Sequence, residues 1–198
     1  MRQLRSVLLS AALMALAGYS GGALADHPAF AVAILEQTES PVNRQVVDLV
    51  NKKDFKQLQA LASKGEVKKA DYKGVAPIHL AAYMGSAEAV KILLKAGVDP
   101  KASTFGGWTA LHYAAFAGQR DVAQLLLAAG VPVDARDTGG ESPMFYAIET
   151  GNLEMVQWLV AHGADVNHTT NHGETPLAAA MENDQRAIVD YLQKLGAK

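Results

Sequence analysis

Histidines are the residues of this sequence best suited to bind a metal ion or to transfer a proton. The chain has six of them, and His162, His168 and His172 lie close together near its C-terminal end. Such a group of imidazoles could form part of a weak metal site or contact the edge of a haem. Its spacing matches no closed metal site, and no thiol completes it because the chain has no cysteine. We therefore expect no metal site and no cofactor.

Signatures of catalysis are also absent from the sequence. It contains no nucleophilic cysteine, no Gly-x-Ser-x-Gly turn, no phosphate-binding glycine loop and no His-Glu-x-x-His helix. Asp134, Asp137, Glu141 and Glu149 are acids that a catalytic pair would need. We interpret them as solvated acids of loops. The chain is thus predicted not to be an enzyme.

Glycines repeat along the chain with a fixed period. Three interleaved series each have a spacing of 33 residues. Periodic glycines belong to turns of a repeated structural unit, and a period of 20–50 residues predicts a solenoid or a similar array. The series are Gly74, Gly107, Gly140 and Gly173; Gly97, Gly130, Gly163 and Gly196; and Gly85, Gly118 and Gly151, which continues at Asp184.

A tetrapeptide recurs with the same period, and it resembles the signature of the ankyrin-repeat family. The resemblance covers about residues 42–198 and implies an all-α solenoid of helix-turn-helix repeats of 33 residues with β-hairpin loops. It also implies that His79 and His112 bond to backbone groups and brace adjacent repeats. The four segments are Ala76-Pro77-Ile78-His79, Thr109-Ala110-Leu111-His112, Ser142-Pro143-Met144-Phe145 and Thr175-Pro176-Leu177-Ala178.

The starts and ends of the helices can be placed within this period. Thr109, Ser142 and Thr175 are expected N-caps, whose side-chain oxygens accept hydrogen bonds from first-turn amides, whereas Ala76 cannot cap. Gly97 and its equivalents in later repeats follow the second helix, where a left-handed residue ends a helix.

The domain organisation follows from these signals. Before the recognisable repeats, residues 46–51 and 54–63 are expected to form two short helices, and Ala29 to Gln37 is a further candidate helix. The expected parts are a signal peptide (1–25), an N-terminal extension (26–41), a degenerate capping repeat (42–73), three ankyrin repeats (74–106, 107–139 and 140–172) and a C-terminal capping repeat (173–198).

The first 25 residues predict export. Arg2 and Arg5 precede an apolar stretch from Val7 to Gly18, and Ala23-Leu24-Ala25 is a small-x-small cleavage motif. The apolar stretch is shorter than the ~20 residues that span a bilayer. We expect a soluble mature chain that begins at Asp26, without a membrane anchor, in a bacterial periplasm.

Charge is unevenly distributed along the chain. The formal net charge is −2, which argues against a general nucleic-acid binder. Residues 52–101 hold ten lysines and five acids, whereas residues 102–198 hold five bases and eleven acids. A solenoid keeps sequence order in space, so we expect a basic end and an acidic end.

The family resemblance also implies a binding surface, made by hairpin loops and the ends of first helices. When these positions are carried over to this chain, apolar residues occupy them in two adjacent repeats and acids occupy them in the next two. Exposed aromatics with a polar surround are typical of an interface. Trp108 is expected at the tip of a loop, where it would brace little of the core. The candidate partner-binding residues are Tyr72, Val75, Tyr83, Met84, Phe105, Trp108, Phe116, Glu141, Glu149 and Glu174.

These observations favour a non-enzymatic protein–protein interaction module that acts as a monomer. The chain resembles small exported ankyrin proteins of Gram-negative bacteria, some of which occur beside catalases. That resemblance implies support of a catalase or of oxidative-stress defence. The alternatives are an immunity or inhibitor protein that binds a toxin or hydrolase, and a haem or metal carrier that uses the C-terminal histidines.

Overall fold

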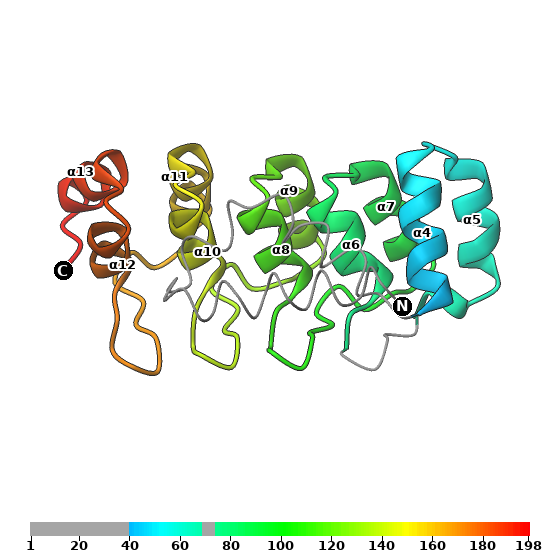
Figure 1. Cartoon of the computed structure of the whole chain (residues 1–198), viewed down its shortest axis with the longest axis horizontal. Coiled ribbons are helices and arrows are strands. Elements are labelled where there is room, and N and C mark those ends of the chain that lie inside the picture. Colours follow the sequence, from blue (N-terminus) through cyan, green and yellow to red (C-terminus); the bar gives the residue numbers. More distant parts are fainter. Residues whose placement is uncertain (1–39, 69–73) are drawn as a thin grey trace, which may run out of the picture. The chain divides into compact units, whose positions relative to one another are not determined.

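The computed structural model describes residues 40–68 and 74–198, which form ten α-helices and one short 3-10 helix (Figure 1). The predicted signal peptide, the candidate helix Ala29–Gln37 and Tyr72 lie outside the described residues. In chain order the helices are α4 (Pro41–Asn51), α5 (Phe55–Ser63), η1 (Glu66–Lys68), α6 (Pro77–Tyr83), α7 (Ala87–Lys95), α8 (Ala110–Phe116), α9 (Arg120–Ala128), α10 (Pro143–Glu149), α11 (Leu153–Ala161), α12 (Pro176–Glu182) and α13 (Arg186–Lys194).

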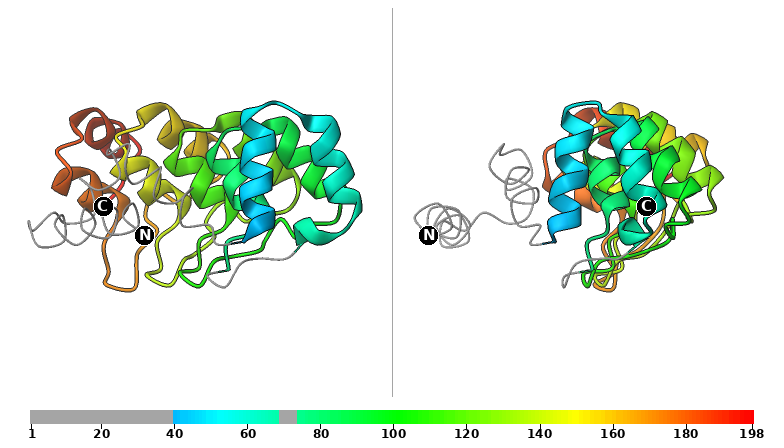
Figure 2. Two further views of the ribbon diagram at one scale, coloured as in Figure 1. Left: turned by 45° about the vertical axis from the view of Figure 1, so that its right-hand side comes forward. Right: turned by 90° about the vertical axis from the view of Figure 1, so that its right-hand side faces the viewer.

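The helices pack in two rows, which confirms the all-α solenoid. Helices α4, α6, α8, α10 and α12 form an inner row, in which each helix contacts the next. Helices α5, α7, α9, α11 and α13 form an outer row, and the two rows separate in the right-hand view of Figure 2. The core lies between them and is built from fully buried Leu58, Ile78, Leu93, Leu111 and Leu126 and their equivalents. None of the described helices has the length and apolar character needed to cross a membrane.

Turn residues end the helices where the period places them. The glycine that follows each outer helix has a positive φ, from 76° at Gly196 to 91° at Gly163. This is the left-handed conformation expected of a C-terminal glycine. Asp184 replaces the glycine after α12 and also has a positive φ, of 54°, which aspartate tolerates better than most residues.

The expected N-caps are only partly confirmed. Thr175 Oγ1 accepts a hydrogen bond from the amide of Ala178 at 3.2 Å. Thr109 and Ser142 occupy the N-cap positions of α8 and α10, as predicted, but the side-chain hydrogen bond expected of Ser142 does not form. At Thr109 the histidine ring of the same turn supplies the reciprocal half of a capping box, because His112 Nδ1 accepts the Thr109 amide at 3.0 Å and lies 2.9 Å from Thr109 Oγ1.

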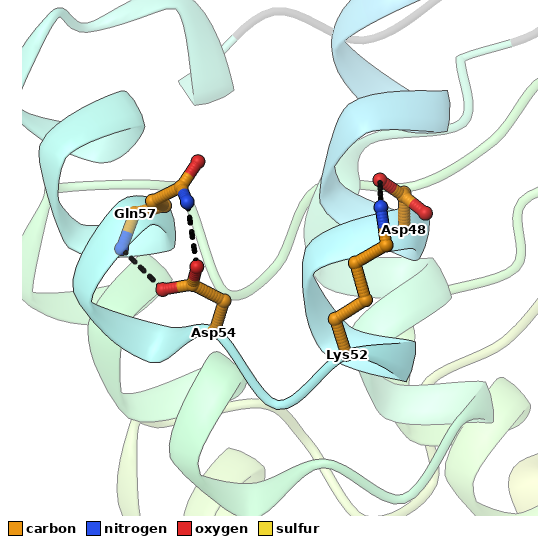
Figure 3. Close-up of polar contacts among 4 residues, drawn as sticks. All are labelled: Asp48, Lys52, Asp54 and Gln57. Atoms are coloured by element: carbon orange, nitrogen blue, oxygen red, sulfur yellow. Dashed lines mark hydrogen bonds and ion pairs between the residues drawn. The ribbon is translucent and has the colours of Figure 1, made fainter.

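The first helix pair has its own local stabilisation (Figure 3). Helix α4 begins at Pro41, earlier than the predicted residue 46, because Ser40 caps it and proline suits the first turn. In the turn to α5, Asp54 caps the helix by accepting from the amide and the side chain of Gln57 at 3.0 and 2.6 Å. Lys52 pairs with Asp48 at 2.8 Å, one turn apart on α4. Both predicted helices of the capping repeat are therefore present.

Candidate partner-binding surface

Two buried histidines fix how the inner helices stack. The Nδ1 atom of each ring accepts a hydrogen bond from the amide three residues earlier, at 2.8 Å for His79 and 3.0 Å for His112. Nε2 then donates to the loop that precedes the next inner helix, to the carbonyl of Ala102 at 2.8 Å for His79 and of Glu141 at 3.3 Å for His112. Burial lowers the pKa of His112 to about 4, so its ring is neutral near pH 7. The predicted bracing role of both histidines is confirmed.

The three C-terminal histidines do not converge on one point. His168 is buried and its Nε2 lies 2.8 Å from the carbonyl of Gly140. His162 stacks on Trp158 with ring centroids 3.8 Å apart, on the outer helix α11, while His172 is exposed in a loop. Within residues 40–68 and 74–198, no three histidine, aspartate or glutamate side chains gather as metal ligands would.

Tight loops precede the inner helices α8, α10 and α12 and extend from one edge of the rows (Figure 1). We call these loops, residues 103–109, 136–142 and 169–175, the fingers. Thr104, Asp137 and Thr170 lie one period apart at their bases. Each accepts, through a side-chain oxygen, a hydrogen bond from the amide four residues later, at 3.2, 2.8 and 3.2 Å. This role of Asp137 was not predicted, although its spacing from the two threonines is visible in the sequence.

Neighbouring fingers are also bonded to one another. The amide of Thr138 donates to the carbonyl of Gly106 at 3.0 Å, and its hydroxyl donates to the same oxygen. One period later, the amide of Asn171 donates to the carbonyl of Gly139 at 2.9 Å. The Asn171 side chain donates to Thr138 as well, at 3.0 Å. Because the fingers form one bonded row, a partner would meet a preorganised surface, at a lower entropic cost.

The apolar part of the surface lies on the first two recognisable repeats. Phe105, at the tip of its finger, is 77% exposed and is the most exposed large apolar side chain described. Trp108 lies at the finger's base, where its ring centroid is 5.5 Å from Tyr113 and 4.4 Å from Tyr146. Both tyrosines are buried, so Trp108 braces the junction of two repeats. The expectation that Trp108 is a fingertip residue was therefore wrong, and Phe105 occupies that place.

The ends of the inner helices extend this apolar part. Tyr83 is half-buried and lies 6.3 Å, between ring centroids, from Phe116. Phe116 is only 9% exposed, so it supports Tyr83 and presents little surface of its own. Val75 and Met84 are half-buried at the beginning and end of α6.

The acidic part occupies the same positions in the next two repeats. Glu141 and Glu174 stand one and two periods after Trp108, and Glu149 stands one period after Phe116; all three side chains are half-buried. Burial raises the pKa of Glu174, with smaller contributions from the charges of Glu182 and Glu141. The charges of Glu141 and Glu174 therefore act on each other, in the two repeats that follow the aromatic part of the surface.

Comparison with known families agrees with the geometry. A family model described as ankyrin repeats, in three copies, matches residues 46–137 and residues 129–198. These matches together cover both helix rows and all three fingers. No curated protein matches the sequence.

Proposed function

Because the chain belongs to the ankyrin-repeat family, whose repeats mediate binding to other proteins, we propose that it binds a partner protein through its fingers and inner helices. The single observation that carries this proposal is the exposure of Phe105 on a loop held rigidly by its neighbours. A large aromatic side chain that is exposed to water in the free monomer stabilises a complex when the partner buries it.

The partner should carry an apolar patch next to a basic one. The surface changes from aromatic around Phe105 and Tyr83 to acidic around Glu141, Glu149 and Glu174, in adjacent repeats. The aromatic region would supply affinity through buried area. The acidic region would steer the approach of a basic patch and set the orientation of the complex.

The sharpest test uses Phe105→Ala. Because this side chain is mostly exposed, its truncation should leave the melting temperature unchanged and weaken binding by about 1–2 kcal/mol. Leu195→Ala is a matched control, since Leu195 is 45% exposed but follows the outer helix α13. Binding is measured by quantitative capture of partners from a cell extract and then by calorimetry with the captured protein. Equal capture by the wild type and by Phe105→Ala would contradict the proposal.

Charge reversal tests the acidic region separately. Glu149→Lys combined with Glu174→Lys should slow association several-fold at low salt and have a smaller effect at high salt. Asp121→Lys combined with Asp190→Lys is the matched control on the outer row, because both side chains are exposed on α9 and α13. A change confined to the dissociation rate would show that these carboxylates contact the partner without steering it.

We further propose that the chain is exported to a bacterial periplasm. This rests on the basic, apolar and small-x-small pattern that ends at Ala25. Cell fractionation and N-terminal sequencing should find a soluble chain beginning at Asp26, and an intact Met1 would contradict this. The resemblance to catalase-associated proteins makes a catalase the first purified partner to titrate against the wild type and Phe105→Ala.

A further inference from the structure

The outer row contains an open groove between α5 and α7. Its volume is about 570 Å³. Phe55 and Ile92 contribute apolar surface to it, and Lys56, Lys68 and Lys95 line it as well. The three lysines come from α5, η1 and the last turn of α7 and are all exposed. The groove is therefore a partly apolar depression with three ammonium groups around it.

These ammonium groups are not neutralised within the described part of the chain. Within residues 40–68 and 74–198, none of the ion pairs involves Lys56, Lys68 or Lys95. The one acid that lines the groove is Glu88, which pairs instead with Lys91 at 3.9 Å. Three like charges around a small depression repel one another, and an anionic occupant would relieve that repulsion.

The equivalent junction two repeats later is bridged by side chains. Between α9 and α11, Arg120 pairs with Glu154 at 3.1 Å. On the same junction His162 Nε2 lies 3.0 Å from Gln124 Oε1. An ion pair and a polar contact thus bridge these two outer helices, whereas lysines line both sides of the groove between α5 and α7. The basic groove is a local feature and does not follow from the repeat itself.

We infer that the groove between α5 and α7 is a second binding site, which takes an acidic peptide segment of a protein. Carboxylates of the segment would contact Lys56, Lys68 and Lys95. An apolar side chain between them would cover Phe55 and Ile92. A free phosphate lacks such a side chain and would leave the apolar part of the groove uncovered. The site lies on the outer row, so the chain can hold an acidic segment while the fingers engage a different protein.

The test is fluorescence anisotropy with a labelled peptide of glutamates flanking one leucine. The peptide should bind the wild type, and the double variant Lys56→Gln/Lys95→Gln should bind at least tenfold more weakly. The matched control is Lys194→Gln/Lys198→Gln, which removes two exposed charges at the other end of the chain. It should retain affinity within about twofold if binding is local. Melting curves check that all variants are folded.

Three outcomes would overturn the inference. The first is equal binding of a peptide in which glutamine replaces glutamate. The second is an equal loss in both double variants, which would indicate attraction to net charge alone. The third is binding of inorganic polyphosphate or of phosphatidylglycerol vesicles without binding of the peptide. Because Phe105 lies on a finger, Phe105→Ala should bind the peptide normally, so failure of either proposal leaves the other intact.

Discussion

The inner and outer rows of helices come from the same repeat but are held together by different interactions. All seven residues of α8 are buried, whereas only three of the nine residues of α9 are. Buried histidines on the inner helices α6 and α8 donate to backbone carbonyls of the loop before the next inner helix. On the exposed side of the outer row, α9 and α11 are joined by one ion pair and one polar contact between side chains. Among the described residues, no ion pair bridges the basic groove between α5 and α7. The inner row therefore fixes the stacking, and the outer row is free to vary in charge.

The largest expected difference between the rows concerns their histidines. His112→Ala would leave the Thr109 amide and the Glu141 carbonyl without partners beside a cavity, at a cost of about 3 kcal/mol in the free energy of unfolding. His162→Ala on the outer row should cost less than ~0.5 kcal/mol because that ring is exposed. Urea unfolding of both variants measures this. Equal losses would mean that the buried bonds do not dominate the stacking.

Acid should lower the free energy of unfolding through the inner row, where His112 is buried. His112 has a pKa of about 4 in the folded chain and an ordinary value of 6.5 when unfolded, so the unfolded state binds more protons between these values. The free energy of unfolding should therefore fall as the pH drops from 6.5 towards 4, by up to ~3 kcal/mol for this residue. Urea unfolding at several pH values tests this. His112→Gln should flatten the dependence, and an unchanged slope would assign it to other groups.

Glycine-to-alanine substitutions compare how tightly the fingers pack with how tightly the turns after the outer helices pack. Gly107 and Gly163 both have positive φ, so alanine strains each by about 1 kcal/mol. A Cβ at Gly107 would also lie 2.7 Å from the backbone nitrogen of Thr138 in the next finger, whereas nothing lies within 4 Å at Gly163. Gly107→Ala should therefore lower the free energy of unfolding by about 2 kcal/mol, roughly twice the loss at Gly163. Similar denaturant midpoints for both would contradict tight finger packing.

The smallest effect is expected at the junction between the outer helices α9 and α11. Arg120 and Glu154 are largely exposed, so their ion pair should contribute less than ~0.5 kcal/mol. A double-mutant cycle with Arg120→Ala and Glu154→Ala, read by thermal unfolding at low and high salt, measures it. A coupling energy as large as the loss in His112→Ala would show that the outer row also determines the stacking.

The prediction of the site was less complete than that of the fold. The residue types and their spacing placed the aromatic and acidic series in neighbouring repeats. They did not distinguish exposed Phe105 from buried Phe116, although both are phenylalanines at candidate positions. Nor did they show that Trp108 packs on Tyr146, which lies in the following repeat. Exposure depends on neighbours about one period away, and local sequence does not specify those contacts.

The family resemblance implied the two bracing histidines, and the sequence by itself determined the period, the helical class and the turn glycines. These features depend on local backbone preferences: a left-handed turn favours glycine, and a proline suits the start of a helix. Only the tertiary structure decided that Trp108 packs on Tyr146, that Phe105 is exposed whereas Phe116 is buried, and that the lysines between α5 and α7 line an open groove. Each of these depends on which side chains meet when neighbouring elements pack, and such contacts are made in three dimensions.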